Sequence, residues 1–119
     1  MKRPHRIQCK RVYEAVDKSD GYRVLVDKVW PRGIKKEDLQ ADGWCKDLAP
    51  SSELRKWFNH EPERWAAFYQ KFHAELDQQS EAIESVLKGT NGGTLTLLYA
   101  AKNEEHNNAV ALKMYLQDK

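Results

Sequence analysis

Two apolar runs constrain the fold of this chain more than any other feature. Their sequences are Tyr22-Arg23-Val24-Leu25-Val26 and Thr94-Leu95-Thr96-Leu97-Leu98-Tyr99. Apolar and β-branched residues dominate both runs, which is typical of strands that are buried on both faces. Several helical patterns lie between them, and such a long crossover favours parallel pairing of the two strands. We therefore predict a single-domain, three-layer α/β/α fold with a small, mainly parallel sheet, in which residues 24–26 and 95–98 are neighbours.

The crossover contains three predicted helices. Pro50-Ser51-Ser52 supplies a proline and capping hydroxyls for the first, and Glu61-Pro62 begins the second. Ser80 is expected to cap the third helix, and Gly89 is expected to end it. The second helix carries an apolar stripe that is expected to belong to the core, formed by Trp65, Phe68, Tyr69, Phe72 and Leu76.

Shorter elements lie outside these helices. Residues 7–13 are expected to form a strand, and residues 35–39 a short helical turn. Residues 43–48 fit a strand or a loop. Asn103 is expected to cap the last helix, which runs to about Leu116.

Length and composition place the chain among single-domain proteins. It has 119 residues, of which 40% are hydrophobic and 32% charged, and this excludes disorder and low-complexity sequence. A chain of this length holds one core, so residues 1–119 are predicted to form one domain. No apolar run approaches the roughly 20 residues of a membrane span, and the N-terminus lacks the apolar core of a signal peptide. We therefore expect a cytoplasmic protein that does not bind a membrane.

The cysteines and histidines give little sign of metal or thiol chemistry. Cys9 and Cys45 form no CxxC pattern and are expected to be small buried side chains, although Lys46 beside Cys45 keeps a reactive thiolate as an alternative. No histidine is paired with another histidine or a cysteine at a metal-ligand spacing, so no metal site is predicted. Nucleotide-binding and hydrolase motifs such as GxGxxG, the P-loop and GxSxG are absent, and the sequence leaves the cofactor unknown.

The first eleven residues form a basic segment. They include no acidic residue, and they contain Lys2, Arg3, Arg6, Lys10 and Arg11. Such a segment can neutralise phosphates of a nucleic acid, with Trp30 or Trp57 as a stacking surface. The alternative is a solvated chain end, because no broad basic face accompanies it.

Two segments that follow predicted strands carry polar side chains suited to a ligand. In open α/β sheets the ligand crevice lies beyond the carboxyl ends of the strands. After the first apolar run come Asp27, Trp30 and Arg32, where Arg32 either binds a carboxylate or phosphate or pairs with Asp47 to fix the loop. After the second run, His106 is a candidate general base or a structural histidine.

A third contribution is expected from Arg55 and His60 at the end of the first crossover helix, unless this end is simply solvated. We predict one polar pocket, with His106 and Asp27 as the candidates for proton transfer. The ligand-binding candidates are Trp30, Arg32, Asp47, Arg55, Tyr99, Lys102 and Asn107.

Three functions fit this prediction. The first is a small enzyme or a sensor for an anionic small molecule, such as a nucleotide or a carboxylate metabolite. The second is a nucleic-acid-associated accessory protein that uses the basic segment. The third is an interaction module without catalysis, in which the polar groups only fasten loops.

Several short motifs are spread over nearly the whole chain. They are Lys10-Arg11-Val12-Tyr13, Asp20-Gly21-Tyr22-Arg23-Val24-Leu25-Val26-Asp27, Trp30-Pro31-Arg32-Gly33, Lys46-Asp47-Leu48-Ala49-Pro50-Ser51, Leu54-Arg55-Lys56-Trp57-Phe58, and Leu97-Leu98-Tyr99-Ala100-Ala101-Lys102 with Glu105-His106-Asn107. Together they resemble the DUF488 family, in its short YeaO-like branch. The resemblance implies a small cytoplasmic bacterial α/β domain, and it implies no particular reaction.

One difference from the longer members of that family concerns thiol chemistry. Those members carry a cysteine after the paired leucines and a Cys-His-Arg run at the start of the last helix. Tyr99 and Asn107-Asn108-Ala109 stand at the corresponding positions here. The resemblance therefore implies that this chain lacks the groups for any thiol or arginine chemistry of those relatives.

Overall fold

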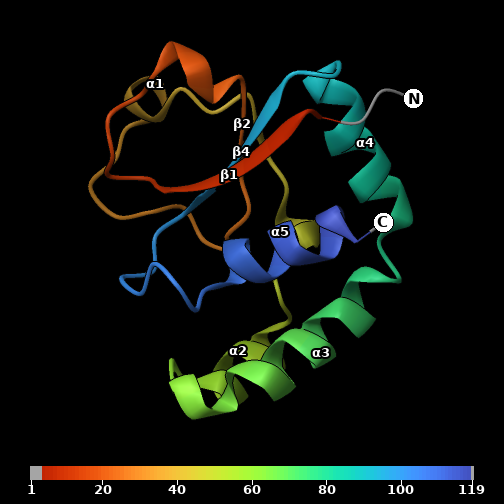
Figure 1. Cartoon of the computed structure of the whole chain (residues 1–119). Helices are drawn as coiled ribbons and strands as arrows, with labels where there is room; N and C mark the ends of the chain where they lie inside the picture. Colours follow the sequence, from red (N-terminus) through yellow and green to blue (C-terminus); the bar gives the residue numbers. More distant parts are fainter. Residues whose placement is uncertain (1–3, 119) are drawn as a thin grey trace.

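A sheet of four parallel strands forms the centre of the computed structural model, which describes residues 4–118 (Figure 1). The strands lie in the order β1-β4-β2-β3, and their bounds are Arg6–Arg11 for β1, Thr94–Tyr99 for β4, Tyr22–Leu25 for β2 and Gly43–Trp44 for β3. Val24 lies opposite Leu97, and Leu25 opposite Leu98, in a parallel pair. The predicted α/β fold and the predicted pairing of the two apolar runs are confirmed.

Helices cover the two faces of the sheet unequally. The main core lies on one face, under α2 (Ser52–Phe58), α3 (Trp65–Leu76), α4 (Ser80–Thr90) and α5 (Asn108–Gln117). On the other face, Leu25 and Leu98 pack with Leu39 of the one-turn helix α1 (Lys36–Leu39). The layer on this second face is therefore thin, with one turn of helix and the loops around it (Figure 1).

The second face also buries a network of charged side chains beside β1 and β2. The Asp20 carboxylate accepts hydrogen bonds from the Lys10 ammonium at 3.0 Å and the Arg23 guanidinium at 2.6 Å. Thr96 on β4 donates its hydroxyl proton to the Asp20 carbonyl. Burial alone would raise the pKa of Asp20, but bonds from Lys10, the Asp17 amide and Arg23 outweigh burial and hold that pKa below its ordinary value. These contacts fix the chain between β1 and β2.

Helices α2 and α3 begin as predicted. Ser51 caps α2, because its hydroxyl oxygen accepts a hydrogen bond from an amide of the first turn. The proline of Glu61-Pro62 begins a 3₁₀ turn, η3 (Pro62–Arg64), which leads directly into α3. The apolar stripe of α3 packs in the main core: Phe68, Phe72 and Leu76 are buried, and Trp65 and Tyr69 are partly buried.

The prediction for α4 was wrong at both ends. The helix starts at Ser80, so Gln79 occupies the capping position, and it continues past Gly89. The chain leaves the helix at Asn91, which has a φ of 48°. Gly89 lies inside the helix. Its position requires a glycine, because a Cβ there would come within 2.4 Å of the Tyr22 ring. This glycine allows close packing of α4 on β2 and does not end the helix.

The prediction that Asn103 caps the last helix was also wrong. The side-chain oxygen of Asn103 accepts hydrogen bonds from the amides of Glu105 and His106, but these bonds close only a local turn. Asn107 is the cap, because its side-chain oxygen accepts a bond from an amide in the first turn of α5. His106 therefore lies in the loop before α5.

The remaining segments are short. Residues 43–48, which fit a strand or a loop, form the short strand β3 at Gly43–Trp44 and then the 3₁₀ turn η2 (Lys46–Leu48). A further 3₁₀ turn, η1 (Lys18–Asp20), lies between β1 and β2. The helical turn expected at 35–39 is α1.

Replacing Phe68 with alanine tests the packing of α3. The Phe68 side chain is 2% exposed, and its ring stacks on Phe58 with centroids 4.3 Å apart. Phe68→Ala is expected to lower the free energy of unfolding by about 3–5 kcal/mol, because it leaves a cavity in the main core. Urea denaturation measures the loss. Tyr69→Ala, on the partly buried side of the stripe, should cost less, and a loss below about 1 kcal/mol for Phe68→Ala would contradict the packing.

The contact between Gly89 and Tyr22 gives a second test. A glycine-to-alanine change inside a helix normally stabilises by about 0.5–1 kcal/mol. Gly89→Ala is expected to destabilise instead, because its methyl group would overlap the Tyr22 ring. In a Tyr22→Ala background the same change should regain the normal stabilisation. A stabilising Gly89→Ala in the wild-type background, measured by urea denaturation, would show that the ring moves aside freely.

Candidate functional site

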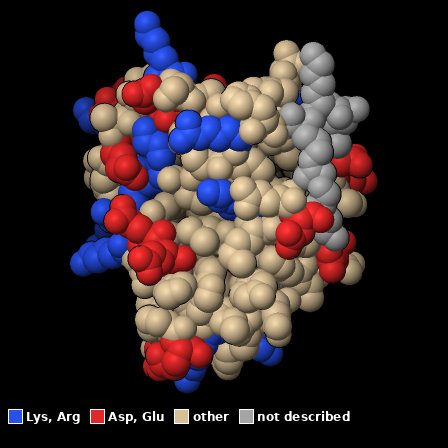
Figure 2. Space-filling view, viewed as in Figure 1, with Lys and Arg blue, Asp and Glu red and all other residues tan. Residues whose placement is uncertain are grey.

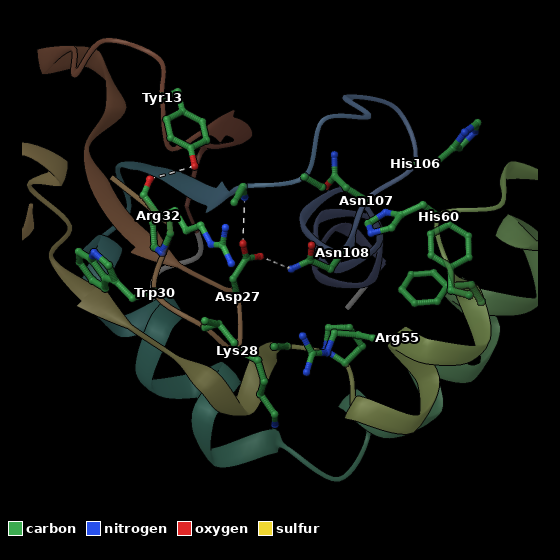
Figure 3. Close-up of a pocket in the computed structure, with 18 residues that line it drawn as sticks. Tyr13, Asp27, Lys28, Trp30, Arg32, Arg55, His60, His106, Asn107 and Asn108 are labelled. Atoms are coloured by element: carbon green, nitrogen blue, oxygen red, sulfur yellow. Dashed lines mark hydrogen bonds between the residues drawn. The ribbon is translucent and has the colours of Figure 1, made fainter. Parts of the chain in front are cut away.

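A cavity of about 440 Å³ lies at the carboxyl ends of the parallel strands (Figure 3). Its walls come from the segments that follow β1, β2 and β4, from α2 and α3, and from the start of α5. This is the edge at which open α/β sheets hold their ligands, and the volume lies within the range of small-molecule sites. Of the predicted site residues, the cavity brings together Asp27, Trp30, Arg32, Arg55, His106 and Asn107.

The Asp27 carboxylate holds the floor of this cavity together. One oxygen accepts a hydrogen bond from the Ala100 amide and the other from the Asn108 side chain, both at 2.9 Å. The same Asn108 amide group donates to the Val26 carbonyl. Burial raises the pKa of Asp27, and the bonds from Asn108 and Ala100, together with the charge of Arg55, oppose this rise. Asp27 therefore fixes the end of β2 to the end of β4 and to α5.

The loop after β2 carries Trp30 and Arg32 and is held by two side-chain hydrogen bonds. The Trp30 indole donates to the Ile34 carbonyl at 2.7 Å, and the Tyr13 hydroxyl donates to the Arg32 carbonyl at 3.2 Å. These bonds fix the loop backbone. They do not involve the Arg32 guanidinium, and Arg32 lines the cavity. The predicted alternative, an Arg32–Asp47 pair, is not formed, since Asp47 lines a separate small cavity.

Arg55 reaches the cavity from α2. Its guanidinium makes one hydrogen bond, to the Ser52 hydroxyl at 3.3 Å. Lys28 also lines the cavity. The ion pairs formed within residues 4–118 join Lys10 and Arg23 to Asp20, and Arg64 to Glu61. Neither Arg32 nor Arg55 therefore forms an ion pair in this part of the chain.

Two imidazoles lie on the side of the cavity opposite Arg32 and Trp30 (Figure 3). His60 follows α2 and has a φ of 55°, a left-handed conformation that costs energy for a residue with a side chain. His106 packs on the Trp65 ring, with centroids 5.0 Å apart. The packing of His106 agrees with the structural alternative for this residue, and its prediction as a general base stays untested.

Apolar side chains complete the wall on the helical side. Phe58 of α2 and Phe68 of α3 both line the cavity, and so does Pro50. Phe68 was predicted only as part of the core stripe, and neither Phe58 nor Asn108 was predicted to line the site. The signal for Asn108 was present, because a second polar amide stands directly at the start of the last helix.

Three predicted ligand-binding residues lie outside this cavity. Tyr99 is 2% exposed and belongs to the main core, because its position on β4 directs the ring to that face. Lys102 is exposed on the loop after β4. Asp47 is exposed within η2.

The basic segment is largely strand β1. Lys2 and Arg3 lie outside the described residues, and Arg6 is exposed. The Lys10 ammonium binds Asp20, and the Arg11 guanidinium donates to the carbonyls of Ala100 and Ala101. On the face shown in Figure 2, Lys and Arg lie interspersed with Asp and Glu.

Cys9 and Cys45 are free and partly buried. Burial raises the pKa of Cys9 to about 11 and also raises the pKa of Cys45. Both are therefore protonated thiols at neutral pH, in agreement with the structural interpretation. Neither side chain lines the cavity.

In the part of the chain that the structure describes, no three His, Cys, Asp or Glu side chains come together as metal ligands. Within residues 4–118, no helix has both the length and the apolar character needed to cross a membrane.

Comparison with known proteins gives a consistent result. A family profile described as "Inactive DUF488-N3 subclade" matches residues 6–119. The chain is 48% identical to "Uncharacterized protein YeaO" of Escherichia coli (strain K12), over 93% of this chain and 96% of that protein. It is 41% identical to "Uncharacterized protein Rv3073c" of Mycobacterium tuberculosis (strain ATCC 25618 / H37Rv), over 98% of each chain. No solved structure matches it significantly. The chain belongs to the DUF488 family, as its motifs indicated.

Proposed function

We propose that this chain binds an anionic small molecule, such as a nucleotide or a carboxylate metabolite, in the cavity at the carboxyl ends of its strands. One observation carries the proposal. Arg32 and Arg55 line a cavity with apolar walls, and neither guanidinium forms an ion pair within residues 4–118. Guanidinium groups bind carboxylates and phosphates through paired, charge-assisted hydrogen bonds.

The single carboxylate in the cavity forms no ion pair with Arg32 or Arg55. Both oxygens of Asp27 are already bonded, to the Ala100 amide and to Asn108. Asp27 therefore supports the floor of the cavity, while Arg32 and Arg55 bind the ligand. The other polar side chains that line the cavity are those of Tyr13, Lys28, His60, His106, Asn107 and Asn108.

Binding without chemistry is the form of this function that the residues favour. The two candidates for proton transfer have structural contacts: each Asp27 oxygen accepts a hydrogen bond that fixes the floor, and the His106 ring packs on Trp65. Neither cysteine lines the cavity. The profile that the chain matches is described as inactive. These points support a sensor or carrier of a small anion over an enzyme.

The proposal is tested first through its two arginines. Wild-type protein is expected to bind a member of a panel of nucleoside monophosphates and aromatic carboxylates in isothermal titration calorimetry. Arg32→Ala and Arg55→Ala should each weaken that binding by about 2 kcal/mol or more, roughly thirtyfold, because a charge-assisted contact is lost.

Lys56→Ala is the matched control, because Lys56 is an exposed cation next to Arg55 on α2 but outside the cavity. It should leave the affinity unchanged. Equal affinities in wild type and in both arginine variants would leave the non-catalytic interaction module as the better account.

The charge that Arg55 brings to the cavity predicts a shift at Asp27. The pKa of this carboxyl lies above its ordinary value because of burial, and Arg55 partly opposes the rise. Arg55→Gln should therefore raise the pKa of Asp27 further, as measured by carbon-13 NMR of the carboxyl. Lys56→Gln should leave it unchanged, and an unchanged value in Arg55→Gln would place the guanidinium away from the floor.

The same carboxyl affects stability in a defined pH window. Since its pKa is higher in the folded chain, the folded state binds the proton more tightly, and the resulting stabilisation is complete below about pH 4. This contribution is lost as the pH rises through the folded-state value. Urea denaturation across this window, with Asp27→Asn for comparison, should show the loss in wild type only.

A further inference from the structure

The walls of the cavity contain more apolar surface than an inorganic anion needs. Trp30 and Pro31 lie on one side, and Pro50, Phe58 and Phe68 lie on the helical side. A cavity of about 440 Å³ exceeds the size of a single phosphate or carboxylate group and falls in the range of organic ligands. Apolar walls of this kind bind an apolar body, because burial of that body removes it from water.

The two guanidiniums, neither of which forms an ion pair within residues 4–118, lie on different walls. Arg32 enters from the loop after β2, beside Trp30, and Arg55 enters from α2 (Figure 3). Each is exposed enough to adjust its position. The third cation of the lining, Lys28, extends away from Asp27 and from both guanidiniums (Figure 3). The two separated guanidiniums therefore match two separated anionic groups better than one.

Asp27 determines where those anionic groups can lie. Its carboxylate belongs to the floor, and an anionic group placed against it would be repelled. The part of the ligand that faces Asp27 is therefore uncharged, and the charges lie toward Arg32 and Arg55.

We infer that the ligand of this cavity is an organic anion with an apolar body and two separate anionic groups, one bound by Arg32 and the other by Arg55. This inference rests on the proposed function and adds the class of ligand to it.

Three probes of increasing complexity test the inference by isothermal titration calorimetry: inorganic phosphate, phenyl phosphate and 4-carboxyphenyl phosphate. Phenyl phosphate is expected to bind at least about tenfold more tightly than phosphate, because its ring is buried by the apolar walls. The added carboxylate should give a further gain of about tenfold, because it forms a second charge-assisted contact.

Two variants separate these contributions. Arg55→Gln should remove the gain from the second anionic group, so that 4-carboxyphenyl phosphate and phenyl phosphate bind with similar affinity. Ala101→Leu places extra volume in the cavity wall and should weaken phenyl phosphate at least about tenfold while phosphate binding is kept. Ala74→Leu, at an exposed position of α3 outside the cavity, is its matched control and should change neither affinity. A thermal melt of each variant confirms that it is folded.

The outcomes distinguish the inference from the proposed function. If phosphate binds as tightly as phenyl phosphate, the apolar body is wrong while anion binding stands. If the carboxylate adds nothing in wild type, the second anionic group is wrong. If none of the three probes binds, and no nucleoside monophosphate or aromatic carboxylate of the panel binds either, the proposed function itself fails.

Discussion

The Asp27 carboxylate joins three parts of the fold at the edge where the cavity lies. Its bonds to the Ala100 amide and to Asn108 connect the end of β2 to the end of β4 and to the first residue of α5. Burial makes this carboxylate costly, and the two bonds and the Arg55 charge offset part of that cost. Because Asp27 fixes where the chain leaves β2, it also fixes the loop that carries Trp30 and Arg32.

The uneven layers of the domain give this cavity its two kinds of wall. On the helical face, Phe58 and Phe68 continue the main core up to the cavity. On the other side the loop after β2 is held by single hydrogen bonds from Trp30 and Tyr13. An apolar, tightly packed wall thus faces a loop that carries the Arg32 guanidinium. This arrangement suits a ligand that has an apolar part and an anionic part.

Much of this was predictable from the sequence, and the exceptions have physical causes. The apolar runs determined the parallel pair, and the parallel pair brought Arg32 and His106 to one cavity although they are far apart in the chain. Tyr99 was misplaced because alternation along a strand turns each residue to one face, and this register is set by packing. Asn103 and Asn107 each have a side-chain oxygen that can cap a helix, so local sequence alone did not identify which of them caps α5. The contributions of Phe58 and Phe68 depend on how α2 and α3 dock, which no local pattern encodes.

The position of β4 has a consequence for how the chain acquires its structure as it emerges from the ribosome. β4 lies between β1 and β2 and pairs with both, yet it is the last strand to be synthesised. Until Thr94–Tyr99 has emerged, β1 has no partner, and β2 has only the two residues of β3. The sheet therefore cannot be completed until synthesis is nearly finished, and the edges of β1 and β2 that pair with β4 stay unpaired until then.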